Sequence, residues 1–156
     1  MTTSPRNVTT VLSIAELEQA AGRDLGTSAW HEIDQQRVSL FADATDDHQW
    51  IHVDPVAAAA GPFGGTVAHG YLTLALLPAL LAELLTISDR ALVVNYGIEK
   101  IRFPAPVTVG SRVRLRAAVA ATERRGAGVL YRLAVTVEID GQEKPALAGE
   151  IVFLAS

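Results

Sequence analysis

The feature that most constrains this chain is a long apolar stretch over residues 70–86, which begins with glycine and has helical character. It is apolar nearly all round, so a helix here must be buried on most sides. Its most apolar part, residues 71–82, is too short to span a bilayer, and Glu83 interrupts it. We therefore predict a buried core helix, which Pro78 kinks because proline removes one helical hydrogen bond.

The cover for this helix is predicted to come from the second half of the chain, where the pattern changes to strands. In one segment Val113 faces opposite to Arg112 and Arg114, so that apolar and charged side chains alternate. Asp140-Gly141 is a strong signal for a two-residue hairpin. Antiparallel strands are predicted over residues 91–103, 111–122, 129–139 and 145–154.

The first half of the chain is predicted to be mainly helical. Ser13 and Glu16 have capping-box spacing, and Asp54-Pro55 suits an N-cap followed by proline at the first helical position. The predicted elements are helices over 14–21, 35–44 and 56–60, a strand over 27–33, a polar loop over 45–52 and a glycine-rich connection over 61–70. Helices followed by a run of antiparallel strands place the chain in the α+β class, with the strands curving around the long helix.

Length and composition narrow the possible classes of protein. The chain has 156 residues, which predicts a flexible tail over 1–10 and a single domain over 11–156. It has no cysteine, which excludes disulfides and thiolate metal sites and fits a reducing, cytoplasmic location. A net charge of -4 argues against nucleic acid as the main partner, and we expect no membrane association.

The densest polar cluster lies in and around the loop before the helix that Asp54-Pro55 begins. A carboxylate and an imidazole held close together suit general acid/base catalysis near neutral pH. An ordinary solvated loop is the simpler interpretation of such residues, because loops are normally polar. The cluster has no paired-histidine helical spacing, so we expect neither a metal nor another cofactor. Its members are Asp43, Asp46, Asp47, His48, His52 and Asp54.

Two further places could contact a substrate. Gly70 follows His69 at the start of the long helix, where unpaired N–H groups and a residue without a side chain suit an oxyanion site. An ordinary helix start is equally consistent with that glycine, and His69 could serve only to position the loop. Lys100 and Arg102 fall on one face of a strand and could bind the phosphates of a carrier such as coenzyme A, or simply face solvent.

These residues resemble a known family. The run from Asp47 to Pro55, an Asp followed five residues later by His and then by Asp-Pro, resembles the hydratase loop of the MaoC-like dehydratases of the R-specific enoyl-CoA hydratase type. Within that family the chain is most similar to the NodN-like branch. The resemblance extends over residues 10–154, and the segments 67–70 and 102–107 also match the family in order and spacing.

The resemblance implies a hotdog fold, in which an antiparallel sheet wraps a long helix, and a homodimer with active sites near the subunit interface. It implies that Asp47 and His52 activate water for addition to a trans-2-enoyl thioester carried on coenzyme A or an acyl carrier, and that the Gly70 N–H polarises the thioester carbonyl. His69 and Arg102 are the other expected substrate contacts. Many members have Asn-Pro inside the loop where this chain has Gln49-Trp50, so Trp50 either lines the acyl tunnel or packs the loop.

Two other functions remain compatible with the residues. A thioesterase of the same fold is one, although the five-residue spacing from Asp47 to His52 resembles the hydratase loop instead. A non-catalytic subunit that binds acyl thioesters is the other, and the presence of both Asp47 and His52 argues against it.

Overall fold

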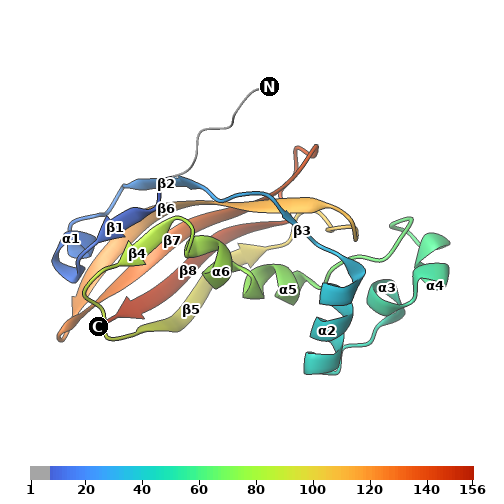
Figure 1. Ribbon diagram of the computed structural model, residues 1–156, viewed down its shortest axis with the longest axis horizontal. Coiled ribbons are helices and arrows are strands. Elements are labelled where there is room, and N and C mark those ends of the chain that lie inside the picture. Colours follow the sequence, from blue (N-terminus) through green and yellow to red (C-terminus); the bar gives the residue numbers. More distant parts are fainter. Residues whose placement is uncertain (1–7) are drawn as a thin grey trace.

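The computed structural model describes residues 8–156, and its centre is one large antiparallel sheet (Figure 1). The strands follow the order β2-β6-β7-β8-β5, and β3 also pairs with β6. Outside this sheet, β1 and β4 form a separate parallel pair. The strands are β1 (Thr10–Leu12), β2 (Asp24–Thr27), β3 (His31–Glu32), β4 (Leu85–Ile87), β5 (Val93–Arg102), β6 (Arg112–Arg125), β7 (Gly128–Ile139) and β8 (Leu147–Ala155).

The alternation found in the sequence explains the two longest strands. Leu115 of β6 pairs with Val137 of β7, and Leu133 pairs with Ile151 of β8, so these buried side chains all face the core. The arginines between them on β6 lie on the other face and pair with carboxylates such as Asp140. Because side chains alternate between the two faces of a strand, one face packs and the other is charged.

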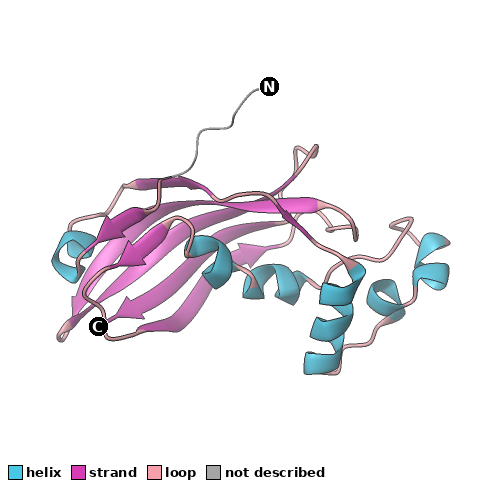
Figure 2. Ribbon diagram, viewed as in Figure 1, coloured by secondary structure: helices cyan, strands magenta, loops and turns pink. Residues whose placement is uncertain are grey.

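The helices lie on the core face of the sheet and at its two ends (Figure 2). Two consecutive helices, α5 (Gly70–Ala75) and α6 (Leu77–Leu81), run along the sheet in place of the single long helix that we predicted. The remaining helices lie at the ends of the molecule. They are α1 (Ile14–Glu18), α2 (Gln35–Thr45), α3 (Trp50–Val53) and α4 (Pro55–Ala59).

The central helix confirms part of the prediction and corrects the rest. It breaks at Leu76, two residues before Pro78, whose ring nitrogen has no hydrogen to donate within the helix. Its predicted end at residue 86 is wrong, because residues 85–87 form β4 and pair with β1. Burial on nearly all sides is also wrong, since Tyr71 is 70% exposed and Pro78 is exposed.

The arrangement of a curved antiparallel sheet around a central helix is the α+β hotdog fold that the resemblance implies. Residues 1–7 of the predicted tail lie outside the described residues, while Thr10 begins β1. Asp140-Gly141 does form a turn, but β8 begins only at Leu147, so the predicted two-residue hairpin is wrong.

The segment α2–α3–α4 projects from the sheet as a helical overhang (Figure 1). The carboxylate of Asp34 caps α2, and that of Asp54 accepts from the N–H groups of Val56 and Ala57, as Asp54-Pro55 predicted. The predicted loop over residues 45–52 is corrected at both ends, because α2 continues to Thr45 and α3 begins at Trp50. Among the described residues, the helices are all too short or too polar to cross a membrane.

Candidate active site

Asp47 and His52 lie where the overhang meets the central helix. Asp46 adopts a left-handed backbone that ends α2, so the chain turns sharply before Asp47. The carboxylate of Asp47 is 53% exposed, whereas His52 on α3 is only 7% exposed. The predicted pair therefore consists of one group that solvent or a substrate can reach and one that the protein encloses.

The hydrogen bond at one ring nitrogen of His52 sets the role of the other. Nδ1 lies 2.6 Å from the backbone oxygen of Val67. Because a carbonyl oxygen can only accept, Nδ1 carries the hydrogen in this bond. In the neutral ring Nε2 then holds the lone pair, which is the state that a general base requires.

His69 joins the predicted pair by two contacts. Its ring stacks on that of His52, with centroids 3.8 Å apart and an interplanar angle of 23°. Its Nε2 donates to the backbone oxygen of Asp47 at 2.9 Å and lies 4.0 Å from the carboxylate Oδ2. His69 thus contacts both residues and fixes the backbone of Asp47 beside the imidazole of His52.

The same three side chains offer a set of metal-ligand type. One carboxylate oxygen and one nitrogen from each ring lie within 4.8 Å of one another. However, His52 Nδ1 and His69 Nε2 are already hydrogen-bonded to backbone oxygens, and Nδ1 of His69 is buried without a hydrogen-bond partner among the described residues. Apart from that nitrogen, the Asp47 carboxylate and Nε2 of His52 are the groups of this set without a hydrogen bond in the described part of the chain, and they are the parts of an acid/base pair.

Gly70 directly follows His69 and begins α5, so its N–H belongs to the first turn, where helical N–H groups have no partner within the helix. A methyl group at Gly70 would lie 3.2 Å from the ring of Phe103, which is tighter than ordinary contact. The absence of a side chain therefore lets Phe103 pack against this turn. Phe103 was missed by the sequence analysis, because an aromatic residue next to proline carries no signal of its own.

In the described contacts, Trp50 and Arg102 touch other residues than His52 and His69. The ring of Trp50 packs over Gly61, where a methyl group would come within 2.9 Å of it. Arg102 donates to the oxygen of Ile101 and forms no ion pair among the described residues. The strand alternation that would align Lys100 with Arg102 is interrupted, since the register shifts between Glu99 and Arg102 and Lys100 has a φ of 55°.

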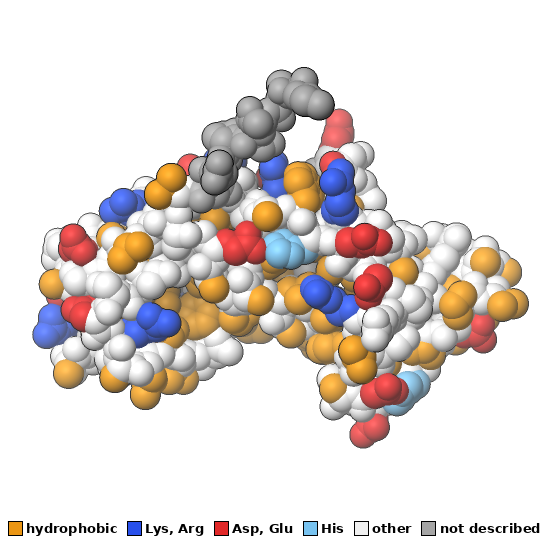
Figure 3. Space-filling view, viewed as in Figure 1, with side chains coloured by type: hydrophobic (Ala, Val, Ile, Leu, Met, Phe, Trp, Pro, Cys, Tyr) orange, Lys and Arg blue, Asp and Glu red, His pale blue; other side chains and the backbone are white. Residues whose placement is uncertain are grey.

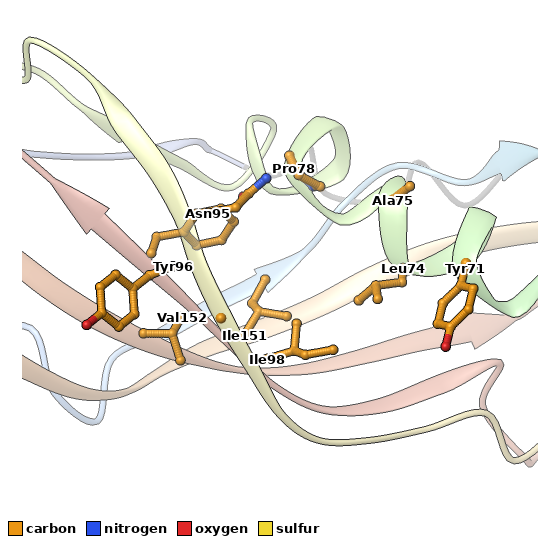
Figure 4. A pocket seen from close by; sticks show the side chains of 11 residues that line it. Tyr71, Leu74, Ala75, Pro78, Asn95, Tyr96, Ile98, Ile151 and Val152 are labelled. Carbon is orange, nitrogen blue, oxygen red and sulfur yellow. The ribbon is translucent and has the colours of Figure 1, made fainter. Parts of the chain in front are cut away.

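An apolar groove lies between the central helix and β5 (Figure 4). Its volume is about 430 Å³, within the range of small-molecule sites, and Tyr71 places one end of it next to Gly70. Sequence analysis missed this groove, because it exists only where the exposed side of α5 and α6 faces the edge strand. Its lining residues include Leu74, Pro78, Ile98 and Ile151. On the face shown in Figure 3, the surface is hollowed between the sheet and the overhang, and hydrophobic side chains lie in that hollow.

A second histidine of the loop forms a separate, exposed pair. Nε2 of His48 lies 2.8 Å from Oδ1 of Asp43. The hydrogen bond to Asp43 raises the pKa of His48 above its ordinary value, and the negative charge of Asp43 adds to the effect. This pair links the loop that carries Asp47 back to α2.

Most of the chain is similar to known proteins. Residues 16–139 match the model of the MaoC like domain. The chain is 52% identical over 141 residues to the 3-hydroxyacyl-thioester dehydratase Z of Mycobacterium tuberculosis, covering 90% of this chain and 93% of that protein. It is 47% identical over 139 residues to Nodulation protein N of Rhizobium leguminosarum bv. viciae, covering 87% and 86%.

A solved structure shows the same fold. The unliganded R-hydratase PhaJ1 from Pseudomonas aeruginosa superposes with a TM-score of 0.75 and 26% sequence identity, covering 92% of this chain and 85% of that one. The likeness therefore extends over both the sheet and the overhang.

Proposed function

The chain belongs to the MaoC-like dehydratase family, and from this premise we propose that it is a hydro-lyase, an R-specific enoyl-thioester hydratase and 3-hydroxyacyl-thioester dehydratase. One observation carries the proposal most directly. The Nδ1–H bond from His52 to Val67 leaves Nε2 as a base in the same cluster as the reachable Asp47 carboxylate. The R-hydratase and thioester dehydratase activities named for the relatives support the reaction class.

In the proposed reaction, water is held between the Asp47 carboxylate and Nε2 of His52. His52 takes a proton from the water as its oxygen bonds to C3 of the trans-2-enoyl thioester. The electrons of the double bond move into the thioester as an enolate, and the proton then passes to C2. Both side chains return to their starting protonation, and the same steps in reverse remove water from a 3-hydroxyacyl thioester.

Gly70 supplies the electrophilic half of the mechanism. Its N–H stands in the first turn of α5, next to the residue that stacks on His52, and would donate to the thioester oxygen. Negative charge on that oxygen grows as the enolate forms, so a fixed donor stabilises the transition state more than the substrate. His69 supports this arrangement, because it hydrogen-bonds to the backbone of Asp47 and stacks on His52 and so holds these two residues next to each other.

The apolar groove and Arg102 support the proposed substrate class. The apolar groove that begins at Tyr71 suits an acyl chain. Arg102, which has no carboxylate partner within residues 8–156, suits the phosphates of coenzyme A or of a carrier protein's prosthetic arm. Trp50 packs the loop in this assignment, since its ring lies on Gly61 and it does not line the groove.

A homodimer is part of the proposal. β5 pairs only with β8 in the described chain, so its other edge is open. An open edge with apolar side chains is the type of surface that a second copy covers. The exposed apolar residues on and beside this strand are Leu92, Val93, Val94, Tyr96, Ile98 and Phe103.

The test is hydration of crotonyl-CoA by the purified protein. The reaction is monitored by the disappearance of the conjugated thioester, and the configuration of the product is determined by chiral analysis. We expect the R-3-hydroxy product, and a loss of about 10²–10⁴-fold in kcat for Asp47→Asn and for His52→Ala, with both variants folded. Full activity in either variant would refute the assigned roles. Release of free thiol from acyl-CoA would instead identify a thioesterase, and binding of crotonyl-CoA without turnover would identify a non-catalytic subunit.

A further inference from the structure

Gln35, the first residue of α2, makes hydrogen bonds with two separate parts of the site. Its Nε2 donates to the backbone oxygen of His52 at 2.8 Å. Its Oε1 accepts from the hydroxyl of Thr66 at 2.6 Å. One amide therefore links the helix that carries His52 to the segment that leads into His69 and Gly70.

The two segments joined by Gln35 have few other links. α3 spans Trp50–Val53, a single turn, and its own hydrogen bonds define little of its position. The backbone N–H of Val67 donates to Ile51 at 3.0 Å, and the His52 imidazole donates to Val67. Loss of the Gln35 contacts would leave α3 held to residues 66–67 by those two bonds.

Thr66 fixes the other end of this link. Its side chain is buried, with 6% of the residue exposed, and its backbone oxygen accepts from the N–H of Val109 at 2.9 Å. Burying a hydroxyl without an acceptor is unfavourable, so Thr66 constrains where the amide oxygen of Gln35 must lie. The position of the amide is thus set by the body of the fold rather than by the overhang.

Only an amide satisfies both partners. The Thr66 hydroxyl needs an acceptor and the His52 carbonyl needs a donor, and the two atoms of a glutamine side chain supply one each. A glutamate here would place a carboxylate oxygen against the carbonyl oxygen of His52, and a leucine would leave both partners unsatisfied.

From this geometry we infer that Gln35 is a positioning residue, which holds the His52 base and the glycine-started helix α5 in one fixed relation through Thr66. The inference rests on the proposed function, because its consequence is a rate. In the proposed reaction, His52 Nε2 and the Gly70 N–H act on the two ends of one conjugated system. The distance between these two groups must therefore stay constant as the enolate forms.

The experiment compares matched variants in the full-length protein. Gln35→Leu removes both bonds, and Gln35→Glu keeps the acceptor but loses the donor. Thr66→Val removes the hydroxyl at nearly constant volume, whereas Thr66→Ser keeps it. Ser39→Ala is the control, because Ser39 accepts a third, longer bond of 3.2 Å from Gln35 and touches neither His52 nor Thr66 in the described hydrogen bonds.

With crotonyl-CoA we expect kcat to fall about 10- to 100-fold in Gln35→Leu, Gln35→Glu and Thr66→Val, with KM within about threefold of the wild-type value. Thr66→Ser and Ser39→Ala should keep the wild-type kcat. Wild-type kcat in Gln35→Leu would overturn the inference, as would equal losses in Thr66→Ser and Thr66→Val. If Gln35→Leu does not fold, the Thr66 pair decides.

A second measurement does not depend on turnover. Proton and nitrogen NMR of the imidazoles should show a protected Nδ1–H signal for His52 in the wild type and in Ser39→Ala. In Gln35→Glu and in Thr66→Val this signal should broaden or disappear. An inactive wild type with this pattern would refute the hydratase and keep the positioning role. An unchanged His52 signal in both variants would overturn the positioning role even in an active enzyme.

Discussion

The sheet and the candidate site are held together by different kinds of interaction. In β6 and β7, many side chains contribute to stability in the same way, by burying apolar surface in the core. Leu115 and Leu133, for example, are fully buried there. In the site, each contact is made once, such as the bond from His52 to Val67 or from His69 to Asp47. The sheet therefore distributes its stability over many positions, while the site depends on a few.

This difference predicts that the two regions fail in different ways under substitution. A change in the sheet should lower the free energy of unfolding and leave the chemistry of the folded molecules intact. A change in the site should lower the rate and leave stability nearly unchanged.

Leu133→Ala should give the largest effect on stability. Leu133 is fully buried in β7, and truncating a buried leucine costs about 2–5 kcal/mol because a cavity remains. Chemical denaturation measures the loss, and kcat per folded molecule at low temperature should equal that of the wild type. A stable variant with a reduced kcat would show that the sheet and the site are not separable.

Gly70→Ala should have an intermediate effect, at the border between the two regions. The added methyl group would lie 3.2 Å from the ring of Phe103, and overpacking of this kind costs about 1–3 kcal/mol. We expect lower kcat/KM together with a lower Tm, because either the Phe103 ring or the first turn of α5 must shift. Phe103→Leu, combined with Gly70→Ala, should recover part of the Tm, and no recovery would contradict the clash as the cause.

The smallest effect should come from the exposed pair of His48 and Asp43. The raised pKa of His48 means that the pair adds stability when His48 is protonated, below its ordinary pKa, and loses it as the pH rises through the raised value. Asp43→Asn should therefore lower Tm slightly at about pH 5.5 and not at about pH 8. An equal change at both values would show that the pair does not titrate as described.

The sequence predicted the sheet better than the site, because a repeated pattern of buried residues can be recognised in a sequence and a single contact cannot. Alternation over many residues placed β6 and β7 and their buried faces, and Asp54-Pro55 placed the start of α4. The exposed side of α5 and α6 could not be predicted, because an apolar helix surface looks the same whether the chain itself or another surface covers it.

Within the site, the sequence predicted which residues gather and missed how they are held. Asp47, His52 and His69 were candidates from their types and spacing, and the structure brings their polar atoms within 4.8 Å. The roles of Gln35 and Thr66 carry no local signal, because they arise from contacts between residues 31 positions apart. Arg102 was named from its place on a strand face and Trp50 from the resemblance, and neither is part of this cluster in the described contacts.

The most direct test of the central claim is a double-mutant cycle on kcat for crotonyl-CoA hydration, with Asp47→Asn, His52→Ala and the two combined. If both side chains act on one water molecule, removing the second should cost little once the first is gone. We predict that the double variant retains about the same kcat as the less active single variant. A double variant whose loss equals the product of the two single losses would contradict a shared acid/base step.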